Sequence, residues 1–140
     1  MSTLFTKIIN REIPGFFIYE DDVCAVFLDK FPAVPGQTVV VPKAEIDYFF
    51  DLPDETYLHI CAIAQVVAKA LDAVYQTERT CVVVEGFEVP HAHMKLYPMT
   101  STETALGEVL PQGKEASDDD LAEAAKRIQS TLEEQISAEQ

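Results

Sequence analysis

The segment Thr-Val-Val-Val-Pro at residues 38–42 constrains the fold more than any other part of the chain. Its side chains are apolar or β-branched on both sides of an extended backbone. This pattern is typical of a central strand buried on both faces, whereas a half-exposed strand would alternate with polar residues. We therefore expect an internal strand of a sheet whose two faces are both covered.

The rest of the chain alternates between strand and helix patterns. Apolar runs of strand length, bounded by turn residues, occupy residues 16–20, 23–28, 80–84 and 91–98. We expect 80–84 to be buried like 38–42. Helical spacing predicts a short helix around Leu4–Ile9, a long one from Pro53 to about Tyr75, and a last one that begins at Asp118. The result is one α+β unit, an antiparallel sheet with helices packed on it.

Helical spacing continues through both of the longer helices. Neighbouring turns of the long helix carry, among others, Leu58, Ala62, Val66 and Ala70. The last helix has an apolar stripe made of Leu121, Ala125, Ile128, Leu132 and Ile136. We expect the last helix to dock by this stripe with its acidic face in solvent. Two other roles stay open, a cover over the mouth of a site or an addition to a dimer interface.

Composition limits the partners and the compartment. The formal net charge of -14 argues against non-specific binding to nucleic acid or to an anionic membrane surface. No stretch of the sequence approaches the apolar length that a membrane span requires. Cys24, Cys61 and Cys81 lie in apolar segments and are interpreted as small buried residues, not as disulfides. We therefore expect a cytoplasmic protein that binds neither nucleic acid nor membrane.

The stretch His91-Ala92-His93-Met94-Lys95 is where the sequence points to chemistry. In a strand, the two histidines and the lysine share one face, and the apolar residues between them face the core. Three interpretations are open: polar decoration of an exposed strand face, a metal site, or a histidine nucleophile beside a cation that binds an anion. The spacing alone favours decoration first, then the nucleophile, then the metal, because a metal would need a third nearby ligand.

The wider sequence resembles the histidine triad family over residues 3–98. The triad motif alternates three histidines with apolar residues, and here Lys95 stands in the place of the third histidine. Order and spacing are similar to the Hint-like nucleotide-binding and hydrolase branch in four further stretches: LFTKIINREIP, YEDDVCAVFLDKFPAVPGQTVVVPK, FFDLPDE and GFEVPHAH. The resemblance implies a triad-type antiparallel sheet with a long helix packed on it, and an extra C-terminal amphipathic helix.

The resemblance also implies roles for individual residues. His93 would attack the α-phosphorus of a nucleoside phosphoramidate or dinucleoside polyphosphate, and His91 would hold its imidazole in the right tautomer. Asp29 would bind the ribose hydroxyls, although an aspartate ahead of a proline loop can also cap a turn. The walls around the base would be Phe5, Ile8, Phe27 and Leu28, each of which is equally plausible as ordinary core.

Several positions depart from the family pattern. Lys95 can stabilise phosphate charge as a mobile cation, but it lacks the geometry of imidazole. Gln37 and Glu45 stand where many members have histidine, and Glu88 stands where a hydroxyl or amide residue is usual. A carboxylate at position 88 would repel phosphate unless it pairs with Lys95 or is protonated. The loop before Gly86 is also shorter than usual.

Taken together, these features predict a nucleotide hydrolase that works through a nucleotidyl-histidine intermediate. The alternatives are a nucleotidyl transferase, or a catalytically weak nucleotide-binding or interaction protein. The implied partners are a purine nucleotide or nucleoside phosphate derivative and a second copy of the chain, paired through the long helix. Thr3 and Thr6 replace the two cysteines that bind zinc in many bacterial members, so we predict no metal cofactor. We assign residues 1–110 to the triad-type domain and 111–140 to an acidic helical extension.

Overall fold

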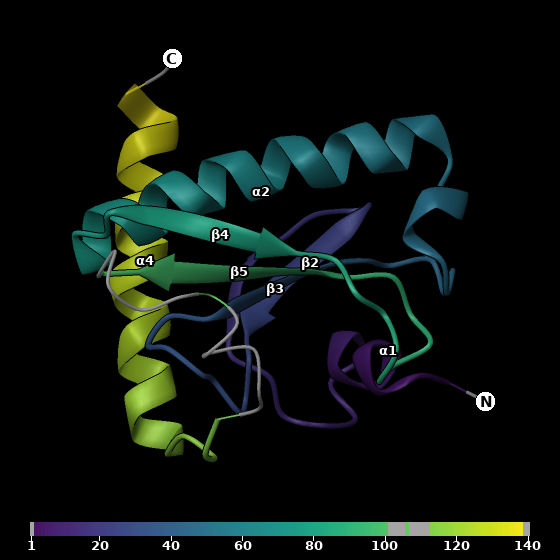
Figure 1. Ribbon diagram of the computed structural model, residues 1–140, viewed down its shortest axis with the longest axis horizontal. Coiled ribbons are helices and arrows are strands. Elements are labelled where there is room, and N and C mark those ends of the chain that lie inside the picture. The colour runs from purple at the N-terminus through teal and green to yellow at the C-terminus, as the bar shows by residue number, and fades with distance from the viewer. Residues whose placement is uncertain (1, 101–105, 107–112, 139–140) are drawn as a thin grey trace.

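A computed structural model of the chain describes residues 2–100, 106 and 113–138 (Figure 1). Five antiparallel strands form one sheet in the order β1-β2-β3-β5-β4. The strands are β1 (Phe17–Glu20), β2 (Cys24–Leu28), β3 (Thr38–Pro42), β4 (Arg79–Val83) and β5 (Met94–Met99). The helices are α1 (Leu4–Ile9), α2 (Asp54–Tyr75) and α4 (Asp118–Ala138), with a short 3-10 turn η1 (Phe49–Asp51) before α2. The α+β fold expected from the sequence is confirmed.

Strand β3 lies at the centre of the sheet, and all five of its residues are buried. Its side chains divide between two apolar clusters, because neighbouring residues of a strand point to opposite faces. Val40 belongs to a large cluster with residues of α2 and α4, whereas Val39 and Val41 belong to a smaller cluster with Phe5 of α1. Figure 1 accordingly shows α1 on the side of the sheet away from α2. Both faces are covered, as the sequence of β3 predicts.

Two strand predictions need correction. Strand β4 is not buried, because it pairs only with β5 and forms an edge of the sheet, where Val82 is 51% exposed. Strand β5 begins at Met94, three residues later than expected. Before it, the backbone bonds elsewhere: the His91 N–H donates to the Val89 carbonyl and the Ala92 N–H to the Ile46 carbonyl. The two histidines therefore precede the strand.

Helix α2 is buried along only part of its surface. Of the residues named from spacing, only Ala70 is buried and Leu58 is 65% exposed, whereas the fully packed residues include Ile60 and Leu71. By length and composition, the helix is also long and apolar enough to span a membrane. Core helices meet the same criterion, and α2 packs against β3, β5 and α4. We expected no stretch to approach the apolar length of a membrane span. The length and composition of α2 show that this expectation was wrong.

Helix α4 docks by the stripe that the sequence predicts. Leu121, Ala125, Ile128 and Leu132 are buried, and only Ile136, at 36% exposed, lies at the edge. The helix crosses behind the sheet in Figure 1 and contacts α2, β1 and β2. Residues 110 and 111, where the two predicted parts of the chain meet, lie outside the described residues, so that division stays a prediction.

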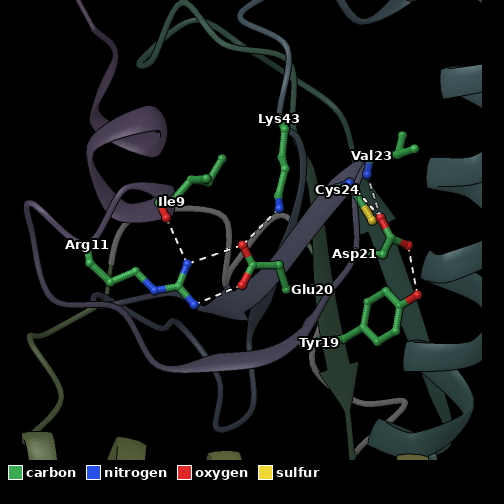
Figure 2. A network of polar contacts seen from close by, with 8 residues as sticks. All are labelled: Ile9, Arg11, Tyr19, Glu20, Asp21, Val23, Cys24 and Lys43. Carbon is green, nitrogen blue, oxygen red and sulfur yellow. Dashed lines mark hydrogen bonds and ion pairs between the residues drawn. The ribbon is translucent and has the colours of Figure 1, made fainter.

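Ion pairs fix the position of α1 relative to the sheet. Figure 2 shows the Glu20 carboxylate between Arg11, which follows α1, and Lys43, which follows β3. Arg11 Nη2 lies 2.8 Å from Glu20 Oε1, and Lys43 Nζ lies 3.0 Å from Glu20 Oε2. Arg11 also donates to the Ile9 carbonyl at 2.7 Å and lies over the Phe17 ring. These contacts hold the end of α1 against the sheet edge.

We predict that Ile128→Ala lowers the free energy of unfolding by about 2–5 kcal/mol, because its fully buried side chain would leave a cavity between α4 and the sheet. Ile136→Ala is the matched control, since the same change at the exposed end of the helix costs much less. Urea unfolding of both variants gives the comparison. Equal, small losses would mean that α4 is not packed as described.

Candidate active site

A cavity of about 460 Å³ opens on the sheet face that α1 covers. It is lined by residues of α1, by the segment before β1, by the end of β2, by the loop after β2 and by residues of β3 and β5. Of the predicted site residues, the cavity wall includes Phe5, Ile8, Phe27, Leu28, Asp29, Gln37, Glu88, His93 and Lys95. His91 is the exception and lies behind the wall.

Within the described part of the chain, one imidazole nitrogen of His93 is held by a hydrogen bond and the other has no partner. Its Nδ1 lies 2.7 Å from the His91 carbonyl oxygen. A carbonyl can only accept, so Nδ1 carries the hydrogen and Nε2 keeps a lone pair. The side chain is 3% exposed and lines the cavity. Burial, followed by the positive charge of Lys95, lowers the His93 pKa from its ordinary value of 6.5. The imidazole is therefore neutral at pH 7 and suited to nucleophilic attack.

His91 acts on His93 through its backbone and not through its ring. Its own Nε2 lies 2.7 Å from the Pro42 carbonyl oxygen, and its Nδ1 lies 2.6 Å from Thr3 Oγ1. The carbonyl partner assigns the hydrogen to Nε2, so Nδ1 accepts from the Thr3 hydroxyl. The ring is completely buried. His91 was expected to fix the tautomer of His93 by hydrogen bonding, and the atom that makes this bond is its backbone carbonyl. The buried ring anchors the His91 backbone.

The threonines that replace zinc-binding cysteines form a hydrogen-bonded group around His91. The Thr3 N–H donates to Glu45 Oε1 at 2.9 Å, and the Thr6 N–H donates to Thr3 Oγ1 at 3.1 Å. The Thr6 hydroxyl, followed by the Thr3 N–H, lowers the Glu45 pKa below its usual value. Thr3 therefore connects the Glu45 carboxylate, the Thr6 backbone and the His91 imidazole in one hydrogen-bonded group.

Lys95 supplies positive charge next to His93. It lies on β5 opposite Val39 and Val83, and its side chain lines the cavity. Within the described part of the chain it makes no ion pair with a carboxylate. The suggested pairing with Glu88 is thus not found, and Glu88 is an exposed residue of the cavity wall. The Lys95 ammonium is available to an anionic ligand.

Asp29 and Gln37 stiffen the loop that joins β2 to β3. Asp29 Oδ1 accepts from the Phe31 N–H at 2.9 Å, which is the turn-capping contact weighed above. Asp29 Oδ2 accepts from Gln37 Nε2 at 2.8 Å, and Gln37 Oε1 accepts from the Ala33 N–H at 2.6 Å. Gln37 is 4% exposed and braces the loop from inside. Asp29 combines a turn cap with a place in the cavity wall, so the two interpretations of it are compatible.

The apolar walls belong to both the core and the cavity. The ring centroid of Phe5 lies 4.8 Å from that of His93 in an edge-to-face arrangement, and 5.8 Å from that of Phe27. Phe27 is 2% exposed and Leu28 is 5% exposed, so both are packed core residues as well as parts of the cavity wall. A flat aromatic or apolar ligand would find a rigid wall here.

Sequence reasoning missed several cavity residues, namely Lys30, Phe31, Tyr97 and Asp118. Lys30 and Phe31 directly follow Asp29, and Tyr97 follows Lys95 by the two-residue period of a strand, so these signals were present in the sequence. Asp118 lies far along the chain at the start of α4. Only the docking of that helix brings it to the cavity, and no local pattern predicts this.

One group of three potential metal ligands occurs among the described residues, outside the cavity: Asp21, Cys24 and His59. Asp21 Oδ1 accepts from the Val23 and Cys24 N–H groups, as Figure 2 shows, and Asp21 Oδ2 contacts the Tyr19 hydroxyl and His59 Nε2. These bonds cap the turn between β1 and β2 and attach it to α2. Cys24 is buried, and burial raises its thiol pKa to about 12. His59 is thus no third ligand for His91 and His93.

We predict that the His93 pKa lies below 6.5 and that Lys95→Met raises it, because removing a nearby cation favours the protonated imidazole. The pKa should stay below the ordinary value in the variant, since burial is the larger cause. Histidine ring resonances followed by NMR across pH 4 to 8 provide the measurement, with His93→Asn to assign them. A normal pKa in the wild type, or no rise in the variant, would contradict this electrostatic account.

Comparisons with known proteins agree with this geometry. The HIT domain family model matches residues 10–102, which include Asp29, Gln37, Glu88, His91, His93 and Lys95. An uncharacterised HIT-like protein of Methanocaldococcus jannaschii is 34% identical over 132 residues, covering 89% of this chain and 97% of its own length. An adenosine 5'-monophosphoramidase of Saccharomyces cerevisiae is 30% identical over 131 residues, covering 93% of this chain and 82% of its own.

A solved structure shows the same fold. The crystal structure of a Hit-like protein from Bartonella henselae, described as involved in cell-cycle regulation, superposes with a TM-score of 0.82 at 27% identity. The match covers 93% of this chain and 96% of that one, so it extends past residue 102, where the family model ends. The matched family model, the similar relatives and the shared fold establish that this chain belongs to the histidine triad (HIT) family.

Proposed function

We propose that this protein hydrolyses nucleoside phosphoramidates or dinucleoside polyphosphates, with His93 as the nucleophile. The observation that carries the proposal is the bond from His93 Nδ1 to the His91 carbonyl, which keeps the lone pair on Nε2, in a cavity that Lys95 also lines. The named activity of the yeast relative, an adenosine 5'-monophosphoramidase, supports the same reaction class. The apolar walls and Asp29 provide the complementary surface for a nucleoside.

The reaction proceeds in two displacements at phosphorus. First, the Nε2 lone pair of His93 forms a bond to the α-phosphorus while the electron pair of the breaking P–N bond goes to the leaving amine, which takes a proton from water. The imidazole, now positively charged, keeps its Nδ1–H on the His91 carbonyl. Water then attacks the phosphorus, one proton passes to solvent, and the nucleoside monophosphate leaves neutral His93 behind.

Lys95 stabilises the charge that develops on the phosphoryl oxygens. Its ammonium is a mobile point charge with three donors, and no carboxylate of the described chain neutralises it. Glu88 acts in the opposite direction, because a carboxylate at the cavity wall repels a phosphate. The balance of these two residues favours a slower enzyme than one with a complete triad. It also makes a nucleotide-binding protein with weak turnover the second candidate.

Incubation with an adenosine phosphoramidate separates these candidates. We expect AMP release by the wild type, and a rate lower by about 1,000-fold or more in His93→Ala, which lacks the nucleophile. His59→Ala is the matched control, since it removes a histidine outside the cavity and should keep most of the activity. Intact-mass measurement on quenched reactions should show a nucleotidyl adduct on the wild type alone.

Each other outcome has a distinct meaning. An adduct that accumulates without AMP release would identify a nucleotidyl transferase that lacks its acceptor. Neither release nor adduct, with measurable binding of AMP, would contradict the hydrolase proposal and support the binding protein.

We also propose that the protein is a homodimer formed through α2 and the edge strand β4. Only 28% of the apolar window of α2 is buried within one chain, and Leu58 on its outer surface is 65% exposed. On β4, Val82 is 51% exposed next to an unpaired strand edge. A second copy that brings the same edge and helix would cover both, as a two-fold symmetric interface requires.

We predict that light scattering of the purified protein gives twice the mass of one chain. Leu58→Glu or Val82→Glu should reduce the measured mass to that of one chain, because a charged side chain in the interface would have to be desolvated. Ile136→Glu, a charge at the exposed end of α4, should leave the dimer intact. A monomeric wild type, or dimers in all three variants, would contradict this interface.

A further inference from the structure

The segment that leads into α4 is attached to the loop after β2. The Ala116 N–H donates to the Lys30 carbonyl at 3.1 Å. Lys30 Nζ lies 2.6 Å from Asp118 Oδ1 and 3.5 Å from Glu115 Oε1. Both lysine and aspartate line the cavity, whereas Glu115 does not. The start of α4 is therefore part of the cavity wall.

A close backbone approach holds this arrangement in place. At Gly113 a Cβ atom would collide with the Pro32 carbonyl oxygen and approach Ala33 closely, so a residue without a side chain is needed there. Inside α4, Leu121 is buried one turn after Asp118. The Asp118 carboxylate is thus anchored from both sides although the side chain itself is 76% exposed.

The position of the Asp118 carboxylate indicates which part of a bound nucleotide it would contact. His93 and Lys95 belong to the β5 segment, whereas Lys30 follows β2, two strands away in the sheet. Two strand spacings amount to about 10 Å, which is the scale of a nucleoside monophosphate from phosphate to base. With phosphate at His93, a base at this distance would lie among the apolar residues near β2, with its polar edge toward Lys30 and Asp118.

We propose that Asp118 and Lys30 read the polar edge of the base and select guanine over adenine. This inference rests on the proposed nucleotide function of the cavity. Guanine presents two adjacent donors, N1–H and the 2-amino group, and a carboxylate can accept both at once. Its neighbouring O6 accepts from the Lys30 ammonium. Adenine places an acceptor, N1, where guanine has a donor, so a carboxylate there repels it.

Calorimetric titration of the full-length protein with GMP and AMP tests the assignment. We expect GMP to bind about tenfold more tightly than AMP, the discrimination that one good bidentate contact gives. Asp118→Asn should bring the ratio of the two Kd values close to one. IMP, which lacks the 2-amino group, should bind the wild type with an intermediate Kd.

Glu115→Gln is the matched control. It removes the same unit of charge near Lys30 but from outside the cavity, so it should keep the preference for GMP. Because Asp118 and Glu115 are both exposed, neither change should affect folding, which circular dichroism checks.

Three results would overturn the inference. Equal affinities for GMP and AMP in the wild type, or an unchanged ratio in Asp118→Asn, would contradict the base assignment while leaving nucleotide binding intact. Loss of the preference in Glu115→Gln as well would attribute it to net charge and not to Asp118. Binding of neither nucleotide would contradict the proposed function itself, and the base assignment would fall with it.

Discussion

The alternation of side chains across a doubly covered sheet determines where this protein can have a site. In β3, Val40 packs toward α2 and α4, and Val39 packs toward α1. In β5, Leu96 enters the core while Lys95 enters the cavity. One face is therefore filled by two long helices. Among the described residues, the other face is covered by a six-residue helix and by loops, and the cavity lies there.

The chemistry of the cavity depends on a short piece of backbone that is not part of the sheet. Because β5 begins at Met94, the His91 carbonyl takes no part in the strand pairing and can accept from His93 Nδ1. The buried His91 ring, held by Thr3 and by the Pro42 carbonyl, keeps this backbone in place. Among the described residues, hydrogen bonds from Thr3 and to Pro42 hold this ring.

Local patterns predicted the parts of the structure that depend on nearby residues. The buried β3, the docked stripe of α4 and the cavity positions of His93, Lys95 and Asp29 all follow from periodicity or from the family resemblance. Features that depend on the order of the strands within the sheet could not be predicted from local sequence patterns. An apolar run such as residues 80–84 has the same composition at a sheet centre as at an edge, where β4 lies.

Details inside the site depend on distant residues in the same way. The alternating motif predicted a strand from residue 91, but the strand begins only at Met94. The Ala92 N–H bonds to the Ile46 carbonyl and the His91 ring to the Pro42 carbonyl, and both partners are distant in sequence. Helix α2 is apolar on most of its surface, so spacing could not tell its inner face from its outer one. Asp118 reaches the cavity only because α4 docks as a whole.

The tautomer of His93 is the most direct test of this account. A long-range proton–nitrogen correlation spectrum of the histidine rings, recorded above pH 7 where the imidazole is neutral, distinguishes a protonated nitrogen from a bare one. The account predicts a hydrogen on Nδ1 of His93 and a bare Nε2. A hydrogen on Nε2 would mean that the His91 carbonyl does not orient the ring, and the proposed nucleophile would lose its lone pair.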